Sequence, residues 1–136
     1  MNIRTLAAFV MSLTAAGTLA AQSLTVKANI PFNFVVSGAT LPAGEYSVGQ
    51  ADSRGPMIVR GGNHDVSAFT LAAPAAAQPD RPGTARLVFH RYGDQYFLYQ
   101  VWTPDGQGEQ IQPTRLEREL TAHGNRPIQA VVAALR

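Results

Sequence analysis

Apolar and polar residues alternate along the stretch that runs from Leu24 to Val36. The apolar positions are Leu24, Val26, Ala28, Ile30, Phe32, Phe34 and Val36, and most of the residues between them are polar. Successive side chains of a strand point to opposite faces, so the pattern predicts a strand with one buried and one wet face. Pro31 cannot donate a ladder hydrogen bond, so we expect this strand to lie at an edge or to bend there. A bend would let the segment serve two sheets or turn a barrel corner.

Shorter apolar segments separated by turn residues continue the pattern. They predict strands at about 46–48, 57–60 and 66–71. The turn signals are residues 41–44 (LPAG), 52–55 (DSRG) and 61–63 (GGN). Residues 73–84 are rich in Pro and Ala and lack periodicity, so we expect an exposed loop there.

Residues 86–103 predict a hairpin. Its two arms are dominated by aromatic and β-branched residues, which strands prefer, and they flank a turn at 92–95 (YGDQ). A second turn signal at 103–106 (TPDG) ends the returning arm.

One short helix is expected near residues 114–122. Thr114 and Glu117 have the spacing of a capping box, in which each side chain satisfies the backbone at the other residue, and Gly124 is placed to end the helix. The i, i+4 pairs along it are Leu116 with Leu120 and Arg115 with Glu119. Residues 128–135 fit a helical stripe and also a strand buried on both faces, and their β-branched content favours the strand.

Together these elements predict an all-β fold. We expect about seven or eight antiparallel strands in a sandwich or a partly closed barrel, with the short helix near the C-terminus. Alternation alone does not decide between sandwich and barrel. Residues 21–136 are expected to form a single β-rich domain, since the chain of 136 residues has room for one domain.

Residues 1–20 have the pattern of a secretory signal peptide. A short basic start at Arg4 precedes an apolar stretch from Leu6 to Leu19, which is too short to span a bilayer. Small residues end the stretch, so we expect cleavage before Ala21, or alternatively just after it. The mature protein is therefore expected in the periplasm or outside the cell, with no membrane span after the signal is removed.

Charge argues against a nucleic-acid partner. Removing Arg4 with the leader lowers the formal net charge from +2 to +1, which leaves no basic surface to attract a polyanion. Stacking aromatics are present, but the basic groove of a single-strand binder is not.

Candidate chemistry is sparse. The chain has no cysteine, so it has neither a disulfide framework nor a thiolate nucleophile or ligand. His64, His90 and His123, with Asp65, lack the spacing of metal ligands, and we expect no metal and no cofactor. Glu117 and Glu119 lie two residues apart on the expected helix and are interpreted as solvated charges rather than a catalytic pair.

One aromatic cluster suggests a binding hypothesis. The predicted hairpin bears His90, Arg91, Tyr92, Tyr96, Tyr99 and Trp102. Aromatic faces with an arginine can stack planar or sugar-like ligands. The alternative, which the general role of aromatic strands favours, is that Trp102 and half of the tyrosines are core residues.

Three segments resemble a family of small exported bacterial proteins, familiar mainly from Acidobacteria, to which no activity is assigned. They are residues 30–48 (IPFNFVVSGATLPAGEYSV), 86–102 (RLVFHRYGDQYFLYQVW) and 113–122 (PTRLERELTA), and the LPAGEY-like element is the most specific. The resemblance implies a secreted or periplasmic β-rich domain. It implies no catalytic residue.

Three functional hypotheses follow. The first is an exported non-enzymatic β domain, a structural or interaction module whose partner is an unknown envelope protein or a small ligand. The second is a barrel-type carrier of a small apolar molecule. The third is a hydrolase of cell-wall or polysaccharide material, for which His90 and Glu45 are the catalytic candidates. The sequence contains no nucleophile motif that would support it.

Overall fold

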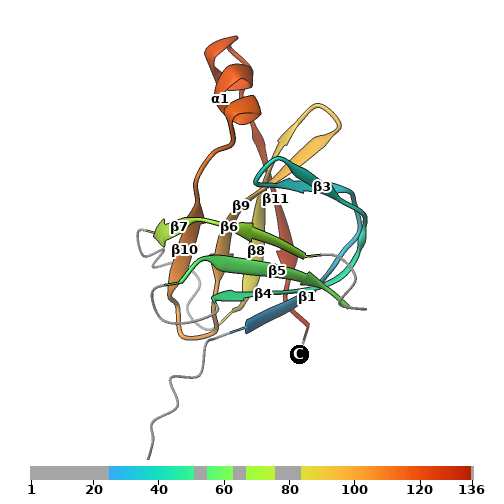
Figure 1. Cartoon of the computed structure of the whole chain (residues 1–136), viewed down its shortest axis with the longest axis vertical. Helices are drawn as coiled ribbons and strands as arrows, with labels where there is room; N and C mark the ends of the chain where they lie inside the picture. The colour runs from blue at the N-terminus through green and yellow to red at the C-terminus, as the bar shows by residue number, and fades with distance from the viewer. Residues whose placement is uncertain (1–24, 51–54, 63–66, 76–83, 136) are drawn as a thin grey trace, which may run out of the picture.

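The computed structural model describes residues 25–50, 55–62, 67–75 and 84–135, and their strands form two sheets (Figure 1). The four-stranded sheet has the order β1 (Thr25–Ile30), β4 (Gly44–Gln50), β5 (Met57–Gly61), β6 (Ser67–Thr70). The other has the order β11 (Ile128–Ala133), β8 (Arg86–Tyr92), β9 (Gln95–Trp102), β10 (Gly108–Ile111), β7 (Ala72–Pro74), with β2 (Phe34–Val36) paired to β9 and β3 (Ala39–Leu41) paired to β2. The predicted all-β fold with one short helix is confirmed.

Bent chain segments connect the two sheets. β1 belongs to the four-stranded sheet and β2 to the other, so the chain crosses between sheets at Pro31–Asn33. The segment returns through β3 and β4, which also lie in different sheets. The bend predicted at Pro31 is therefore confirmed, and it serves two sheets. Figure 1 shows the strands of one sheet running across those of the other, an arrangement in which strands that change sheet form the corners.

The LPAGEY-like element stabilises this corner. The backbone N–H of Ala43 donates to the side-chain oxygen of Asn33 (3.0 Å), which ties the outgoing bend to the returning one. The Tyr46 hydroxyl donates to the carbonyl of Pro42 (2.5 Å). Both bonds hold the chain where its backbone leaves one ladder and enters the next.

The sheets also meet at their other margins without closing into a barrel. β6 continues into β7, so this segment too passes from one sheet to the other. On the opposite side the N–H of Leu135, just after β11, donates to the carbonyl of Lys27 in β1 (2.7 Å). Counting each bent pair as one strand gives eight strands, and the open alternative of the two predicted, a sandwich, is the one observed.

The core lies between the sheets and contains the apolar face predicted from the alternation. Val26, Ala28, Ile30, Phe34 and Val36 are buried, and Phe32 is partly exposed. The ring of Phe34 meets those of Tyr46 and Phe89 edge to face, with centroids 5.0 and 5.6 Å away. Further core residues from both sheets are Leu41, Val48, Met57, Val59, Ala68, Leu87, Leu98, Val101 and Ile111.

The β8–β9 hairpin has the predicted position and turn. Gly93 and Asp94 connect the strands, and Gly93 has φ +61°, which glycine adopts without steric cost. The register shifts between Val88 and Phe89: Val88 pairs with Gln100 and Phe89 with Leu98. Tyr99 is therefore an extra residue on β9, and its ring stacks on that of His90.

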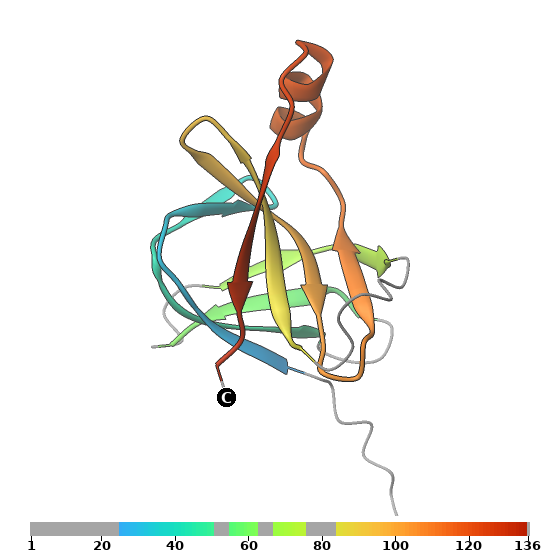
Figure 2. The same cartoon turned by 180° about the vertical axis from the view of Figure 1, so that it is seen from behind.

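The helix α1 (Arg115–Ala122) stands at one end of the molecule, between β10 and β11, and the chain end after β11 lies at the opposite end (Figures 1 and 2). Thr114 is the N-cap, as predicted, and its hydroxyl accepts the N–H of Glu117 (3.2 Å). Gly124 follows with φ +83°, and its N–H donates to the carbonyl of Thr121, so the predicted helix end is confirmed.

Some sequence-based expectations need correction. Residues 128–133 form the predicted strand, but β11 lies at a sheet edge and is largely exposed, rather than buried on both faces. Ala73 and Pro74, expected in a loop, belong to β7 and pair with β10, because an edge strand tolerates a proline. Most of the turn predicted at 52–55, most of the loop at 73–84 and the leader at 1–20 lie outside the described residues. None of the helices in the described part of the chain has the length and apolar character that crossing a bilayer requires.

Candidate functional site

An open depression lies between the outer face of the β8–β9 hairpin and α1. Strand alternation directs His90 and Tyr92 of β8 to this face. Tyr99 of β9 also lies on it, two residues after Phe97, the partner of His90. The depression measures about 370 Å³ and is lined by His90, Tyr92, Tyr99, Pro113, Glu117, Arg118, Thr121 and Pro127. We call it the hairpin–helix pocket.

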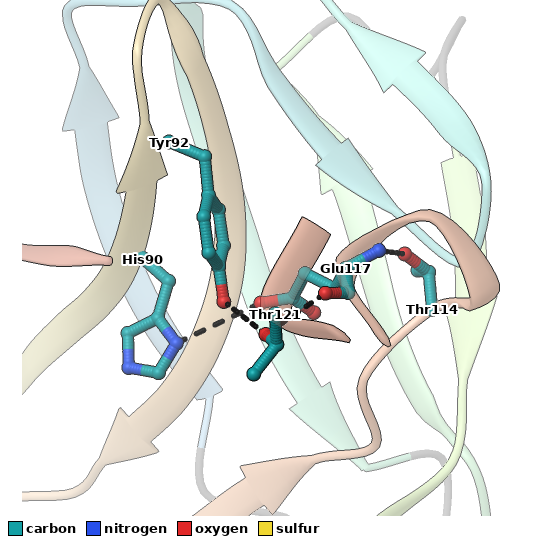
Figure 3. Close-up of polar contacts among 5 residues, drawn as sticks. All are labelled: His90, Tyr92, Thr114, Glu117 and Thr121. Atoms are coloured by element: carbon teal, nitrogen blue, oxygen red, sulfur yellow. Dashed lines mark hydrogen bonds and ion pairs between the residues drawn. The ribbon is translucent and has the colours of Figure 1, made fainter. Parts of the chain in front are cut away.

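His90 is the central side chain of the pocket. Its ring stacks on that of Tyr99, with centroids 3.7 Å apart and an interplanar angle of 24°. Its Nδ1 lies 3.6 Å from Oε1 of Glu117, and the two side chains are 15% and 6% exposed (Figure 3). The distance is that of an ion pair and is too long for a hydrogen bond.

Local helix contacts hold Glu117 toward the hairpin. Its N–H donates to the Thr114 hydroxyl. Its carbonyl accepts a hydrogen bond from the hydroxyl of Thr121, one helical turn further along the chain (3.0 Å). The oxygen of Thr121 also lies 3.4 Å from the hydroxyl of Tyr92. Figure 3 shows His90 and Tyr92 on β8 directed toward this side of the helix. The capped first turn therefore fixes the direction from which the carboxylate enters the pocket.

The arrangement supplies an imidazole and a carboxylate within largely apolar walls. Electrostatic interactions are stronger in such surroundings than in water, because fewer solvent dipoles screen them. The hydroxyl of Thr121 is engaged with the helix backbone. The pocket can thus bind a charged or hydrogen-bonding group by its carboxylate and an apolar group by its walls.

The six residues of the sequence-predicted cluster separate into three places. His90, Tyr92 and Tyr99 line the pocket. Arg91 and Tyr96 lie on the other face of the hairpin, where the Arg91 guanidinium lies 5.7 Å from the Tyr96 ring and Tyr96 stacks on Phe32. Alternation separates Arg91 from its neighbours, so it does not join the predicted site.

Trp102 is also absent from the pocket. It is 2% exposed, and its indole N–H donates to the side-chain oxygen of Gln100 (3.1 Å). The Arg86 guanidinium lies 5.1 Å from its ring. Trp102 is thus a packing residue, the alternative that the sequence analysis favoured.

Sequence reasoning missed the helix side of the pocket. The interpretation of Glu117 as a solvated charge is wrong, because the residue is only 5% exposed. Leu116, expected on the apolar side of the helix, is 43% exposed. The reason is that α1 stands at the end of the sheets and contacts the hairpin through its Glu117 and Thr121 side. The capping signal at Thr114 was the available hint, since it fixed the helix start.

The three histidines do not meet in the described structure. His64 and Asp65 lie outside the described residues. His123 is the C-cap of α1, and its Nδ1 lies 2.7 Å from the carbonyl oxygen of Glu119. Among residues 25–50, 55–62, 67–75 and 84–135, no three His, Asp or Glu side chains gather as metal ligands would.

Comparisons with known proteins return no counterpart. No family model matches the chain, and neither a curated protein nor a solved structure is significantly similar to it. What the site can bind is therefore inferred from the residues of the pocket.

Proposed function

We propose that this protein is an exported, non-enzymatic interaction module that binds a component of the cell envelope in the hairpin–helix pocket. The observation that carries the proposal is the largely buried pair of His90 and Glu117 at the wall of an open, mostly apolar depression. Concave surfaces with apolar walls and a few converging polar groups are the common form of binding sites.

Export is part of the proposal. It is supported by the leader-like pattern of residues 1–20 and by the resemblance of residues 30–48, 86–102 and 113–122 to small exported proteins. The absence of cysteine is compatible with an oxidising compartment and does not require one.

A carrier with an internal chamber is less well supported. The buried side chains of both sheets contact one another as one cluster that includes Phe34, Phe89 and Val48. Filled space between the sheets favours a surface site over an enclosed ligand.

A hydrolase is also less well supported. His90 and Glu117 form an imidazole–carboxylate pair, but catalysis of acyl transfer also needs a nucleophile within reach of the base. Thr121, which lines the same pocket, donates its hydroxyl proton to the helix backbone. Glu45 is exposed on β4, in the other sheet.

Site-specific photo-cross-linking in the native host tests the proposal. A photoreactive side chain replaces Arg118 at the rim of the pocket, and a matched control replaces Arg60, which is exposed on β5 in the other sheet. We expect a discrete adduct from position 118 that is absent from position 60 and is lost when Tyr99→Ala is added. An adduct of equal yield from both positions, or none from position 118, would refute the proposal.

A further inference from the structure

We propose that the hairpin–helix pocket binds a primary ammonium group carried on an apolar stem, as in a lysine side chain, with the ammonium against the carboxylate of Glu117. This inference rests on the proposed function, because it names the ligand class for the same pocket. Three features support it: the charge of Glu117, the apolar walls of the pocket, and the carboxylate oxygen of Glu117 that does not face His90.

The charge comes from a carboxylate largely removed from water. Glu117 lines the pocket although the residue is only 5% exposed. A desolvated carboxylate interacts more strongly with a cation than an exposed one does, because solvent screens the interaction less. Its neighbour His90 lies 3.6 Å away, beyond hydrogen-bond distance, and two carboxylate oxygens have about four lone-pair sites in all. Glu117 therefore keeps capacity for a donor supplied by a ligand.

The walls match a hydrocarbon stem rather than a sugar. Tyr92, Tyr99, Pro113 and Pro127 present mostly carbon to the pocket. An aliphatic chain can pack against these surfaces, and the tyrosine rings attract a nearby cation. A saccharide would bring several hydroxyl groups, each of which needs a partner when it leaves water. Besides the Glu117 carboxylate, the His90 imidazole and a few groups at the rim, the walls are apolar and offer few partners to those hydroxyls.

The carboxylate geometry favours ammonium over guanidinium. Nδ1 of His90 lies 3.6 Å from Oε1 of Glu117, so the imidazole crowds the approach to this oxygen without forming a hydrogen bond to it. A guanidinium binds a carboxylate best through two parallel hydrogen bonds, which use both oxygens. An ammonium is a compact charge that needs one oxygen, and it therefore suits the remaining edge.

Arg118 makes the inference sharply testable. It is an exposed cation at the rim, so water and salt screen it more than they screen Glu117. For a cationic ligand, Arg118 is weakly repulsive and Glu117 is the attractive group. For an anionic ligand these roles are exchanged, so neutral variants of the two residues must change affinity in opposite directions.

The experiment titrates the mature protein with Nα-acetyl-lysine amide and follows backbone NMR shifts. Nα-acetyl-norleucine amide, which has a similar stem without the ammonium, is the matched probe. We expect lysine-probe shifts centred on His90, Tyr99 and Thr121, and roughly tenfold weaker binding of the norleucine probe. Glu117→Gln should weaken lysine-probe binding about tenfold, and Arg118→Gln should strengthen it about twofold. Glu119→Gln, on the exposed side of the same helix, should leave the affinity unchanged.

Each result decides the inference. Equal binding of the two probes, unchanged affinity in Glu117→Gln, or weaker binding in Arg118→Gln would overturn it. Arg118 is exposed, so its variant remains informative even if Glu117→Gln perturbs the helix. A peptide with one lysine flanked by glycines distinguishes the source: tighter binding than the amide probe supports a polypeptide partner, and equal binding supports a small amine. If the lysine probe fails while the adduct at position 118 persists, the ligand class is wrong and the interaction module stands.

Discussion

Individual side chains in this protein acquire their roles from the face on which the backbone places them. His90, Arg91 and Tyr92 are consecutive, yet His90 and Tyr92 line the pocket while Arg91 interacts with Tyr96 on the other face. The bulge at Tyr99 is equally local: Tyr99 has no partner in the β8–β9 ladder, and its ring stacks on that of His90. Neighbours in the sequence can thus belong to different surfaces.

Gly108 is required because the Trp102 ring lies against its backbone. A Cβ at this position would come within 2.5–2.7 Å of three ring carbons. We expect Gly108→Ala to lower the free energy of unfolding by about 1–3 kcal/mol, measured by urea denaturation. Gly62→Ala is the control, because its Cβ would meet nothing closer than 3.5 Å. Equal stability of the two variants would show that the Trp102 ring can move aside without cost.

The contribution of Tyr46 to stability depends on pH, because its hydroxyl ionises at alkaline pH. Burial raises the pKa of Tyr46, and its hydroxyl donates to the Pro42 carbonyl. A folded-state pKa above the unfolded value means that the neutral form stabilises the fold at lower pH and that this contribution is lost as pH rises through the folded pKa. We expect Tyr46→Phe to lose about 1 kcal/mol at neutral pH.

The same variant should lose less stability than the wild type as the pH rises above about 10, the ordinary pKa of tyrosine, because the folded-state pKa of Tyr46 lies above that value. Urea denaturation at a series of pH values measures both effects. Parallel pH profiles of the two proteins would contradict this role of Tyr46.

At the scale of elements, the helix depends on its ends more than on its apolar residues. Leu116 is largely exposed, so α1 gains little from burying it. Thr114 at the start and Gly124 at the end provide the bonds that stop the backbone from fraying. Since Glu117 lies in the first turn, the cap also determines whether the pocket is formed.

Removing the cap should therefore loosen the helix selectively. We expect Thr114→Ala to cost about 1 kcal/mol of helix stability. Amide hydrogen exchange should accelerate in α1 and leave the β5 amides of the four-stranded sheet unchanged. Uniform acceleration across both elements would mean that the cap contributes to global unfolding instead.

Sequence periodicity predicted the elements well because it reflects local geometry. The bend at Pro31, the 92–95 turn and the Thr114 cap each depend on residues close in sequence, and all three are observed. The pocket was only half predicted. His90, Tyr92 and Tyr99 share one hairpin, whereas Glu117 reaches them from an element that packs against it from elsewhere in the chain.

At the scale of the whole molecule, one core joins the two sheets. Phe34 of β2 touches the rings of Tyr46 in the four-stranded sheet and Phe89 in the other. The bent segments cross at this core, so each sheet depends on packing against its partner. A protein built in this way is expected to unfold as a unit.

Phe34→Ala should therefore destabilise both sheets together, by about 3–5 kcal/mol. Thermal unfolding followed by circular dichroism and by Trp102 fluorescence should give coincident transitions at a lower temperature. Phe69→Ala is the matched control, because Phe69 is 60% exposed on β6 and should change stability little. Separate transitions for the two probes in Phe34→Ala would show that the sheets unfold independently.

The amino-acid pattern was enough to predict most of the strands, the two ends of the helix and the buried face of the first strand, but it did not predict β3, β7 or β10. These properties follow from alternation, capping and turn chemistry over a few residues. The open sandwich and the position of the Glu117 carboxylate beside His90 became known from the three-dimensional fold. Both depend on how distant elements pack, and packing between distant segments produces no periodic pattern along the chain.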